Sequence, residues 1–270
     1  MKSVVSVLLI AASGLGLVAC SQDSGGVQSS KDAADLFQQR SILRVGLRHK
    51  IALTIDDGPT RGVTEPMLDY LRAEGIKATF FVQGKQVRGQ EATLKKMMDH
   101  GHVIANHTFE HPNLPKLVAE QGWPALRAQV AKTNTAIEPY TQPGGRLYFR
   151  APGGAWQAGF ADYLNQDSVL REYIGPIYWD IGGDKITRRS DGSVATAADW
   201  RCWSAGLTVD ECAQGYLNET DLHDGGIVLM HDLKGQSVQM LKKLIPEWRR
   251  RGYTFVTLDE IDYLDRYATN

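Results

Sequence analysis

Residues 50–59, KIALTIDDGP, hold the pattern that decides the fold. Apolar and β-branched residues dominate the first six positions, as in a buried strand, and the next four are residues that end a strand in a turn. By itself, a turn of this sequence most often has only a structural role. Asp56 and Asp57 are nevertheless candidates for chemistry, because parallel α/β barrels place their reactive groups where the strands end.

Strands and helices alternate on both sides of this stretch. Buried-type runs predict the strands, and apolar residues at helical spacing predict the helices. The expected strands are residues 50–55, 78–82, 102–105, 147–150, 177–181, 227–230 and 255–258, and the expected helices are 64–73, 90–100, 119–137 and 238–250. A long polar stretch follows residue 181 and is expected to be mostly loop. The alternation indicates an α/β fold with parallel strands, in a single catalytic domain without internal repeats.

Polar residues end or follow four of the expected strands. They are Asp56–Asp57, Asn106–His107, Arg150 and His231–Asp232. Because the carboxyl ends of parallel strands meet on one face of a barrel, these side chains are expected to share one site.

His107 and His111 are candidates for metal ligands. Residues four apart share a face of a helical turn, although Pro112 biases His111 away from helical geometry. Two histidines at this spacing, without further ligands, are only weak evidence for a metal site. Together with one carboxylate, two imidazoles leave open positions on a metal, which suits catalysis. Such ligands favour zinc, with cobalt, nickel or manganese as alternatives.

The composition fits a globular protein without a preference for nucleic acid. The chain has 270 residues, 43% of them hydrophobic, which is enough for one large core. Its 30 basic residues are balanced by 31 acidic ones, so no positive excess supports a nucleic-acid partner. We expect a monomer, although the composition does not fix the oligomeric state.

The amino terminus has the features of an export signal. After the basic Met1–Lys2, the apolar run at residues 4–19 is too short and too rich in small residues for a spanning helix. It ends in LVAC at residues 17–20, which resembles the bacterial lipoprotein cleavage box. The expected segments are a signal peptide at 1–19, a lipid-anchored tether at 20–42 that starts with a lipidated Cys20, and the catalytic domain at 43–270. The alternative is an ordinary signal peptide with a chance cysteine.

Two consequences of export are expected. Ser21 stands where an aspartate would retain an enteric lipoprotein in the inner membrane, so a Gram-negative host would carry this protein on its outer membrane, facing the periplasm. Cys202 and Cys212 are expected to form a disulfide, because paired cysteines in an exported domain are usually bridged. The alternative is two buried thiols.

Four motifs occur in order along the chain. They are TIDDGP at residues 54–59, HTFEH at 107–111, RAPGG at 150–154 and LMH at 229–231. With ATFFVQG at 78–84 and GYTFVTL at 252–258, they resemble the successive motifs of the polysaccharide deacetylase family, carbohydrate esterase family four. The resemblance extends from about residue 48 to residue 260. It implies a distorted (β/α) barrel with fewer than eight complete units, and an enzyme that removes acetyl groups from N-acetylated amino-sugar polymers.

The resemblance also implies a role for each motif residue. Asp57, His107 and His111 would hold the metal, Asp56 would be the general base, Arg150 would orient that base, His231 would be the general acid, and the backbone N–H of Gly153 would stabilise the oxyanion. The chemistry agrees, because an adjacent cation favours an ionised Asp56 and a histidine can supply a proton near neutral pH. Asn106 is a candidate for shaping the ligand loop. The histidines outside the motifs are expected to be packing or surface residues: His49, His100, His102 and His223.

The chain departs from the family pattern in two places. Gly153 stands where the family usually has an aromatic residue, so one wall of the substrate pocket is expected to be missing. The fourth motif begins at Tyr178 but is stretched by an insertion, and its ending, Asp199–Trp200, is expected to supply the carboxylate that orients His231. Asp180 and Asp184 are the alternatives. The segment that follows, which contains both late cysteines, is expected to be a stapled loop beside the cleft.

Three tryptophans in these loops are candidates for stacking on sugar rings, or for packing under the loops: Trp156, Trp200 and Trp203. The expected substrate is N-acetylglucosamine in an envelope polysaccharide, peptidoglycan first, with chitin or its oligomers and an exopolysaccharide as alternatives. Two other classes remain open: a non-catalytic glycan-binding lipoprotein and a deacylase of small amides or esters. Binding alone would require none of Asp56, Arg150 and His231.

Overall fold

The computed structural model describes residues 37–42, 47–183, 185–262 and 264. The predicted signal peptide and Cys20 lie outside these residues. Within the described part of the chain, no helix is both long enough and apolar enough to cross a membrane.

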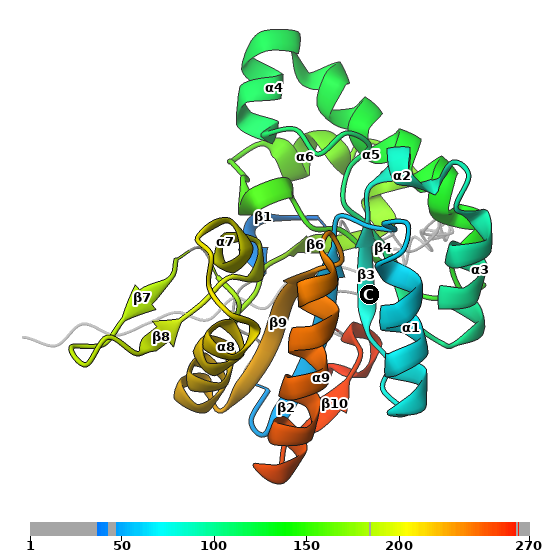
Figure 1. Ribbon diagram of the computed structural model, residues 1–270. Coiled ribbons are helices and arrows are strands. Elements are labelled where there is room, and N and C mark those ends of the chain that lie inside the picture. Colours follow the sequence, from blue (N-terminus) through cyan, green and yellow to red (C-terminus); the bar gives the residue numbers. More distant parts are fainter. Residues whose placement is uncertain (1–36, 43–46, 184, 263, 265–270) are drawn as a thin grey trace, which may run out of the picture. The chain divides into compact units, whose positions relative to one another are not determined.

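Strand β2 (Lys50–Asp56), which the sequence predicts at residues 50–55, lies at the centre of the sheet. It pairs in parallel with β9 (Gly225–His231) along its whole length, with β10 (Thr254–Val256) at its start and with β3 (Thr79–Val82) at its end. Strand β3 in turn pairs in parallel with β4 (Val103–Asn106). In Figure 1, β9 lies beside α9 (Gly235–Arg250), and β2 passes behind that helix.

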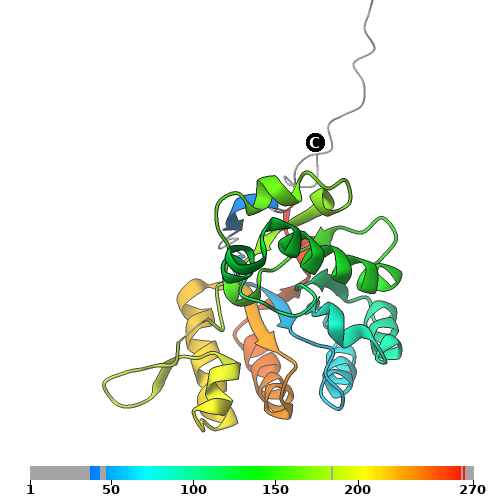
Figure 2. The ribbon, with the colours of Figure 1, turned by 90° about the horizontal axis from the view of Figure 1, so that it is seen from above.

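The sheet closes into a distorted (β/α) barrel. A bridge between Asn106 and Phe149 joins β4 to β5 (Leu147–Tyr148), which pairs in parallel with β6 (Tyr173–Ile177). Beyond β6, a bridge between Ile181 and Val228 leads back to β9. Seen from above, the strands lie at the centre and helices surround them (Figure 2). The predicted barrel with fewer than eight complete units is thereby confirmed.

The helices pack on the barrel through apolar stripes. In α9 (Gly235–Arg250), buried Val238, Leu241, Ile245 and Trp248 recur every three or four residues, the spacing of one helical face. Helices α1 (Thr64–Ala73) and α3 (Glu91–Asp99) match the predicted ranges closely. The described helices also include the short α2 (Gly84–Val87), which packs on the helix at residues 123–137, and α6 (Phe160–Leu164), which packs on the strand at residues 37–42.

The expected helix at 119–137 is wrong as a single element. The chain forms α4 (Leu114–Gln121) and α5 (Trp123–Ile137), which are separated at Gly122. Gly122 has φ 80° and ψ 173°, a conformation that is essentially restricted to glycine and that no helix contains. Pro124 then occupies the first turn of α5, where a missing N–H has no cost.

The expected strand at 177–181 is displaced. The observed β6 ends at Ile177, and in the following segment only Ile181 bridges to β9. In the sequence, Gly175 and Pro176 are residue types that usually interrupt a strand. In the structure, a Cβ at Gly175 would lie 2.7 Å from the Phe149 carbonyl oxygen. The glycine is therefore part of the strand, because it allows β5 and β6 to approach closely.

The stretch between Ile181 and β9 is structured rather than mostly loop. It holds the hairpin β7 (Thr187–Arg188) and β8 (Val194–Thr196), then α7 (Asp199–Ser204) and α8 (Val209–His223). Thr208 and Glu211 form a capping box at the start of α8. The segment that was predicted to be a stapled loop thus forms two helices. The prediction was wrong because the polar residues on their outer faces obscure the apolar stripe in the sequence.

The predicted boundary between tether and domain at residue 43 lies too late. Strand β1 (Phe37–Ile42) pairs in parallel with β6 and belongs to the folded domain. The buried ring of Phe37 packs on Phe149, Trp156 and Tyr173. Residues 38–41 are polar, so no alternating strand pattern marks β1 in the sequence.

Candidate active site

The carboxyl end of β2 places two carboxylates side by side. Asp56 lies in register with Phe81 of β3 and His231 of β9, so three strand ends meet here. Asp57 follows with φ 81°, a left-handed conformation that is uncommon for a residue other than glycine. This turn directs the two neighbouring carboxylates to different partners, although both are buried.

Asp57 lies beside the two motif histidines. Its Oδ1 atom is 3.2 Å from Nε2 of His111 and 3.6 Å from Nε2 of His107. One ligand atom from each of these three residues lies within 4.8 Å of the others. Burial acts against the carboxylate of Asp57, yet the three nearby histidines and the Gln83 amide together lower its pKa. The site therefore favours an ionised Asp57.

Residues around this set hold the histidines in place. The Nδ1–H of His107 donates to the backbone oxygen of Arg150 at 2.9 Å, which leaves Nε2 directed at Asp57. Asn106 donates to the Val130 carbonyl and accepts from the Thr108 N–H, so it shapes the ligand loop. Burial and the adjacent His107 lower the pKa of His111, which favours the neutral imidazole that a metal requires.

The three residues fit a divalent metal. Two neutral imidazoles and one carboxylate, with their donor atoms already converged, are the ligand types of catalytic zinc sites and leave positions open. The sequence prediction of Asp57, His107 and His111 as one cluster agrees with this geometry.

Asp56 pairs with a fully buried arginine. Nη1 of Arg150 donates to Asp56 Oδ1 at 2.7 Å and to Thr54 Oγ1 at 2.8 Å. The guanidinium of Arg150 lies 4.1 Å from the centre of the Phe81 ring, which covers one of its faces. The second oxygen of Asp56 is 3.5 Å from Nε2 of His107. Arg150 thus holds one oxygen of Asp56 and leaves the other facing the metal donors.

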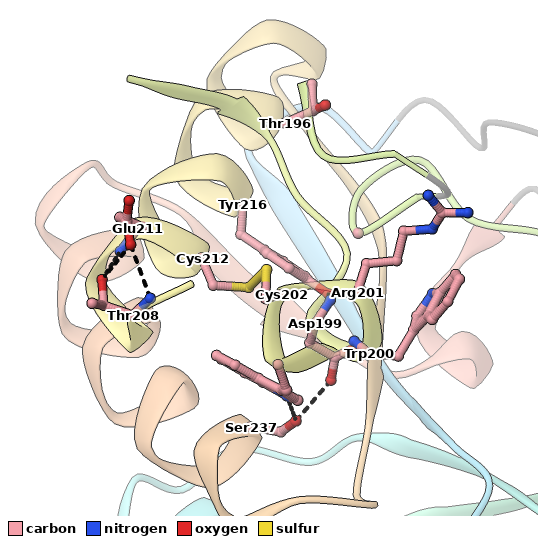
Figure 3. The surroundings of a disulfide bond; sticks show 12 residues. Thr196, Asp199, Trp200, Arg201, Cys202, Thr208, Glu211, Cys212, Tyr216 and Ser237 are labelled. Atoms are coloured by element: carbon pink, nitrogen blue, oxygen red, sulfur yellow. Dashed lines mark hydrogen bonds between the residues drawn. A yellow bond between two sulfur atoms is a disulfide. The ribbon is translucent and has the colours of Figure 1, made fainter. Parts of the chain in front are cut away.

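His231 is bound to the carboxylate of Asp199. Nδ1 of His231 is 2.7 Å from Asp199 Oδ1, and its backbone N–H donates to Oδ2 at 2.9 Å. Ser237 also donates to Oδ2, a contact drawn in Figure 3. Burial acts against the imidazolium, but Asp199, with smaller contributions from Asp57 and Asp56, outweighs burial and raises the pKa of His231 to about 9. Asp199, rather than Asp180, is therefore beside His231.

Neither alternative to Asp199 is seen beside His231 among the described residues. Oδ2 of Asp180 accepts from the backbone N–H of Ile227, away from His231. Asp184 lies outside the described residues.

These groups line one cavity of about 330 Å³ at the carboxyl ends of the strands. Its walls comprise Asp56, Asp57, His107, His111, Gly153, Trp179, Trp200, Leu229, His231 and Leu233. A Cβ at Gly153 would meet no atom within 4 Å, so the cavity is open at this position, as the missing family aromatic predicts. A volume of this order holds a small ligand.

The three candidate tryptophans separate here. Trp200 lines the cavity and is 44% exposed, as a stacking surface requires. Trp156 does not line it: the ring packs against Phe37, Phe149 and Phe160, and its N–H donates to the Gln38 carbonyl. The expected substrate contact by Trp156 is therefore wrong, and the packing alternative holds because β1 covers this ring. Trp203 is partly buried and donates to Ser237.

The structure also describes the two late cysteines and two of the histidines outside the motifs. Cys202 and Cys212 are bridged, with an S–S distance of 2.06 Å, and the bond joins α7 to α8 (Figure 3). His102 is a packing residue, since it lies edge-on to Phe80 and burial lowers its pKa to about 4. His49 lies at the surface beside Asp224.

Several contributors escaped the sequence analysis. Gln83 donates to Asp57 at 2.7 Å, and Thr54 and Ser237 anchor Arg150 and Asp199. Gln83 and Thr54 stand inside quoted motifs, so their position was a usable signal. Leu229 likewise stands in the quoted LMH motif. Ser237 and Leu233 carry no such signal, because only the fold brings Ser237 to Asp199 and Leu233 to the cavity.

A cavity with a base, an acid and converged metal donors at the strand ends of a barrel is typical of a hydrolase. The sequence profile described as polysaccharide deacetylase matches residues 46–169. Peptidoglycan-N-acetylglucosamine deacetylase PgdA of Listeria monocytogenes is 31% identical over 78% of this chain and 38% of its own length. A chitooligosaccharide deacetylase of Sinorhizobium fredii is 28% identical over 78% of this chain and 90% of its own.

A solved structure, that of T48 deacetylase with substrate, is 30% identical and has a TM-score of 0.62. The similarity covers 81% of this chain and 93% of that one. The chain belongs to the polysaccharide deacetylase family, carbohydrate esterase family four. It spans little more than a third of the length of the Listeria protein, 38%.

Proposed function

We propose that this protein is a metal-dependent N-deacetylase that acts on N-acetylglucosamine units of an envelope polysaccharide. The observation that carries the proposal is the convergence of Asp56, Asp57, His107, His111 and His231 on one open cavity. Family membership supports the same reaction class.

Hydrolysis of an acetamide requires a base, an acid and a site for the oxyanion. Asp57, His107 and His111 would hold a divalent metal, which we take to be zinc; such an ion would supply a Lewis acid for the acetyl carbonyl and lower the pKa of a water. Asp56 accepts the proton of the attacking water, and Arg150 fixes its carboxylate. As the carbon–nitrogen bond breaks, the imidazolium of His231 gives its proton to the amine. The products are acetate and a free amino sugar.

Two other groups serve the oxyanion and the sugar. The backbone N–H of Gly153, at the edge of the cavity, is suited to stabilise the developing negative oxygen. Trp200 offers an exposed aromatic face for a sugar ring.

Peptidoglycan is the substrate that we favour. The Listeria relative is named for peptidoglycan N-acetylglucosamine, whereas the Sinorhizobium relative is named for chitooligosaccharides. The test is acetate release from purified peptidoglycan, chitin oligomers and poly-N-acetylglucosamine, with and without a chelator. Release from peptidoglycan alone, abolished by the chelator, supports the proposal. Absence of release from all three polymers contradicts it.

The two remaining classes are separable in the same assay. A glycan-binding protein without activity would retain the polymer but release no acetate, and the buried Asp56–Arg150 pair argues against it, since binding does not require a buried base. A deacylase of small molecules would cleave an acetate ester faster than any polymer.

The location that we propose is the cell envelope. The apolar run and the LVAC sequence at residues 17–20 support export and a lipid anchor at Cys20. In a Gram-negative host, the domain would face the periplasm from the outer membrane.

A further inference from the structure

A second cavity adjoins the proposed catalytic one. It has a volume of about 460 Å³ and shares three wall residues with the first, namely Trp200, His231 and Leu233. The remaining walls come from α7 and from the segment that begins α9. Two cavities with a common wall at the proposed acid are suited to two successive sugars of one polymer.

The walls of this second cavity combine aromatic and polar groups. Trp200 is 44% exposed and borders both cavities, and Trp203 lies deeper on the same helix. The disulfide between Cys202 and Cys212 fixes this helix to α8. The aromatic surface is therefore held in place by a covalent link, not by a free loop.

The charge that remains available in this cavity is positive. Asp199 is fully engaged, because its two oxygens accept from His231, Trp200 and Ser237. Lys234 lines the cavity and is exposed, and no carboxylate of the described residues forms an ion pair with it. The guanidinium of Arg201 lies 4.8 Å from the centre of the Trp200 ring (Figure 3), but Arg201 lines neither cavity, so the positive charge of this cavity is that of Lys234.

We propose that this cavity binds the sugar next to the one that is deacetylated, and that Lys234 pairs with a carboxylate carried by that neighbouring sugar. The inference rests on the proposed function and specifies its substrate. A neutral polymer of N-acetylglucosamine offers no partner for the ammonium group. A glycan whose alternate sugars carry a lactyl ether with a free carboxyl group, not one amide-linked to a peptide, offers one carboxylate for each pair of sugars, which matches the charge of the cavity.

The experiment compares two tetrasaccharides that differ only in charge. Both alternate N-acetylglucosamine with its lactyl ether; one has free carboxylates and the other has them converted to methyl amides. Acetate release gives kcat/KM for each, and the measured quantity is their ratio. The wild-type enzyme should prefer the free carboxylate, and Lys234→Gln should lower the ratio roughly three- to tenfold, as for a partly exposed charge-assisted contact. Lys234→Glu should lower it further.

Lys77→Gln is the matched control. Lys77 is exposed and precedes β3, at the opposite end of the strands from the cavity, so its removal should leave the ratio unchanged. A ratio that Lys234→Gln does not change overturns the inference, as does a wild-type ratio near one, which would indicate that only a neutral sugar is bound. Absence of acetate from both tetrasaccharides would instead count against the proposed function itself.

Discussion

Asp199 sets the protonation state of His231 and so controls the proposed acid. With Asp199 present, the pKa of His231 is about 9, and the imidazolium persists through neutral pH. Asp199→Asn removes the opposite charge, so the pKa of His231 falls and the alkaline limb of the pH–rate profile moves to lower pH. We expect kcat to fall by about 10²-fold, within the usual range for general acid catalysis.

The check is a full pH–rate profile together with metal analysis. Metal content should be unchanged, because Asp199 is not among the converged donors. Asp210→Asn, which removes an exposed carboxylate that pairs with Lys243 on the surface, is the control and should leave the profile in place. An Asp199→Asn variant whose alkaline limb stays at the wild-type pH would contradict this role.

The sequence revealed the functional residues that end or follow strands, but not the residues whose role depends on packing. Asp56, His107, Arg150 and His231 end strands or directly follow them, so one rule of barrel architecture brings them together. Trp156 had the same local appearance as Trp200. Only the position of β1 over its ring separates a core residue from a cavity wall.

Helix α7 carries Asp199 and Trp200 and is the element that the disulfide fixes. The bond closes a loop with a sequence separation of 10, which in the chain-entropy model is worth roughly 2–3 kcal/mol. Replacement of both Cys202 and Cys212 by Ala should lower the free energy of unfolding by about that amount. It should also lower kcat, because α7 no longer holds Asp199 against His231.

Denaturant unfolding with and without a reductant measures this effect. The reductant should destabilise the wild-type protein and have no further effect on the double variant. Equal unfolding free energies of the wild type and the double variant would be incompatible with a stabilising bridge.

The break between α4 and α5 depends on one glycine. Gly122→Ala places a side chain at φ 80°, ψ 173°, where only glycine is comfortable, and should cost about 1–3 kcal/mol of stability. Glu120→Ala, at an exposed position of α4, should change stability by less than about 0.5 kcal/mol. Thermal or denaturant unfolding of both variants provides the comparison, and a neutral Gly122→Ala would mean that the helices do not need this break.

Elements with an apolar stripe and clear ends were predictable, and the others were not. Helices α1, α3 and α9 combine such stripes with a glycine or polar end. Residues 119–137 also have helical spacing, but the conformation of Gly122 is a property of its backbone that spacing does not record. Helices α7 and α8 are short or polar on their outer faces, and their apolar contacts are visible only after folding.

For the whole molecule, the lipid anchor remains a prediction outside the described residues. Cys20→Ala should leave the protein soluble or with an uncleaved signal peptide, because lipid attachment and lipoprotein processing require the thiol. Membrane fractionation combined with mass spectrometry of the amino terminus is the measurement. A variant that is processed normally and still sediments with membranes would show that the anchor is elsewhere.

The barrel could be predicted because its motifs follow one another in strand order. The extent of the folded domain could not be, because β1 enters the sheet through a pairing with β6 that is remote in sequence. The position of the second cavity was equally hidden, since it arises where α7 meets the start of α9.

The central claim is that Asp57, His107 and His111 hold a metal on which acetate release depends. The most direct measurement is a zinc titration of chelator-treated protein that records bound metal and acetate release from peptidoglycan in parallel. Activity should start near zero, rise with bound zinc and reach its plateau at about one metal per chain, whereas Asp57→Ala should bind zinc weakly and stay inactive. Full activity in metal-free protein would contradict the account.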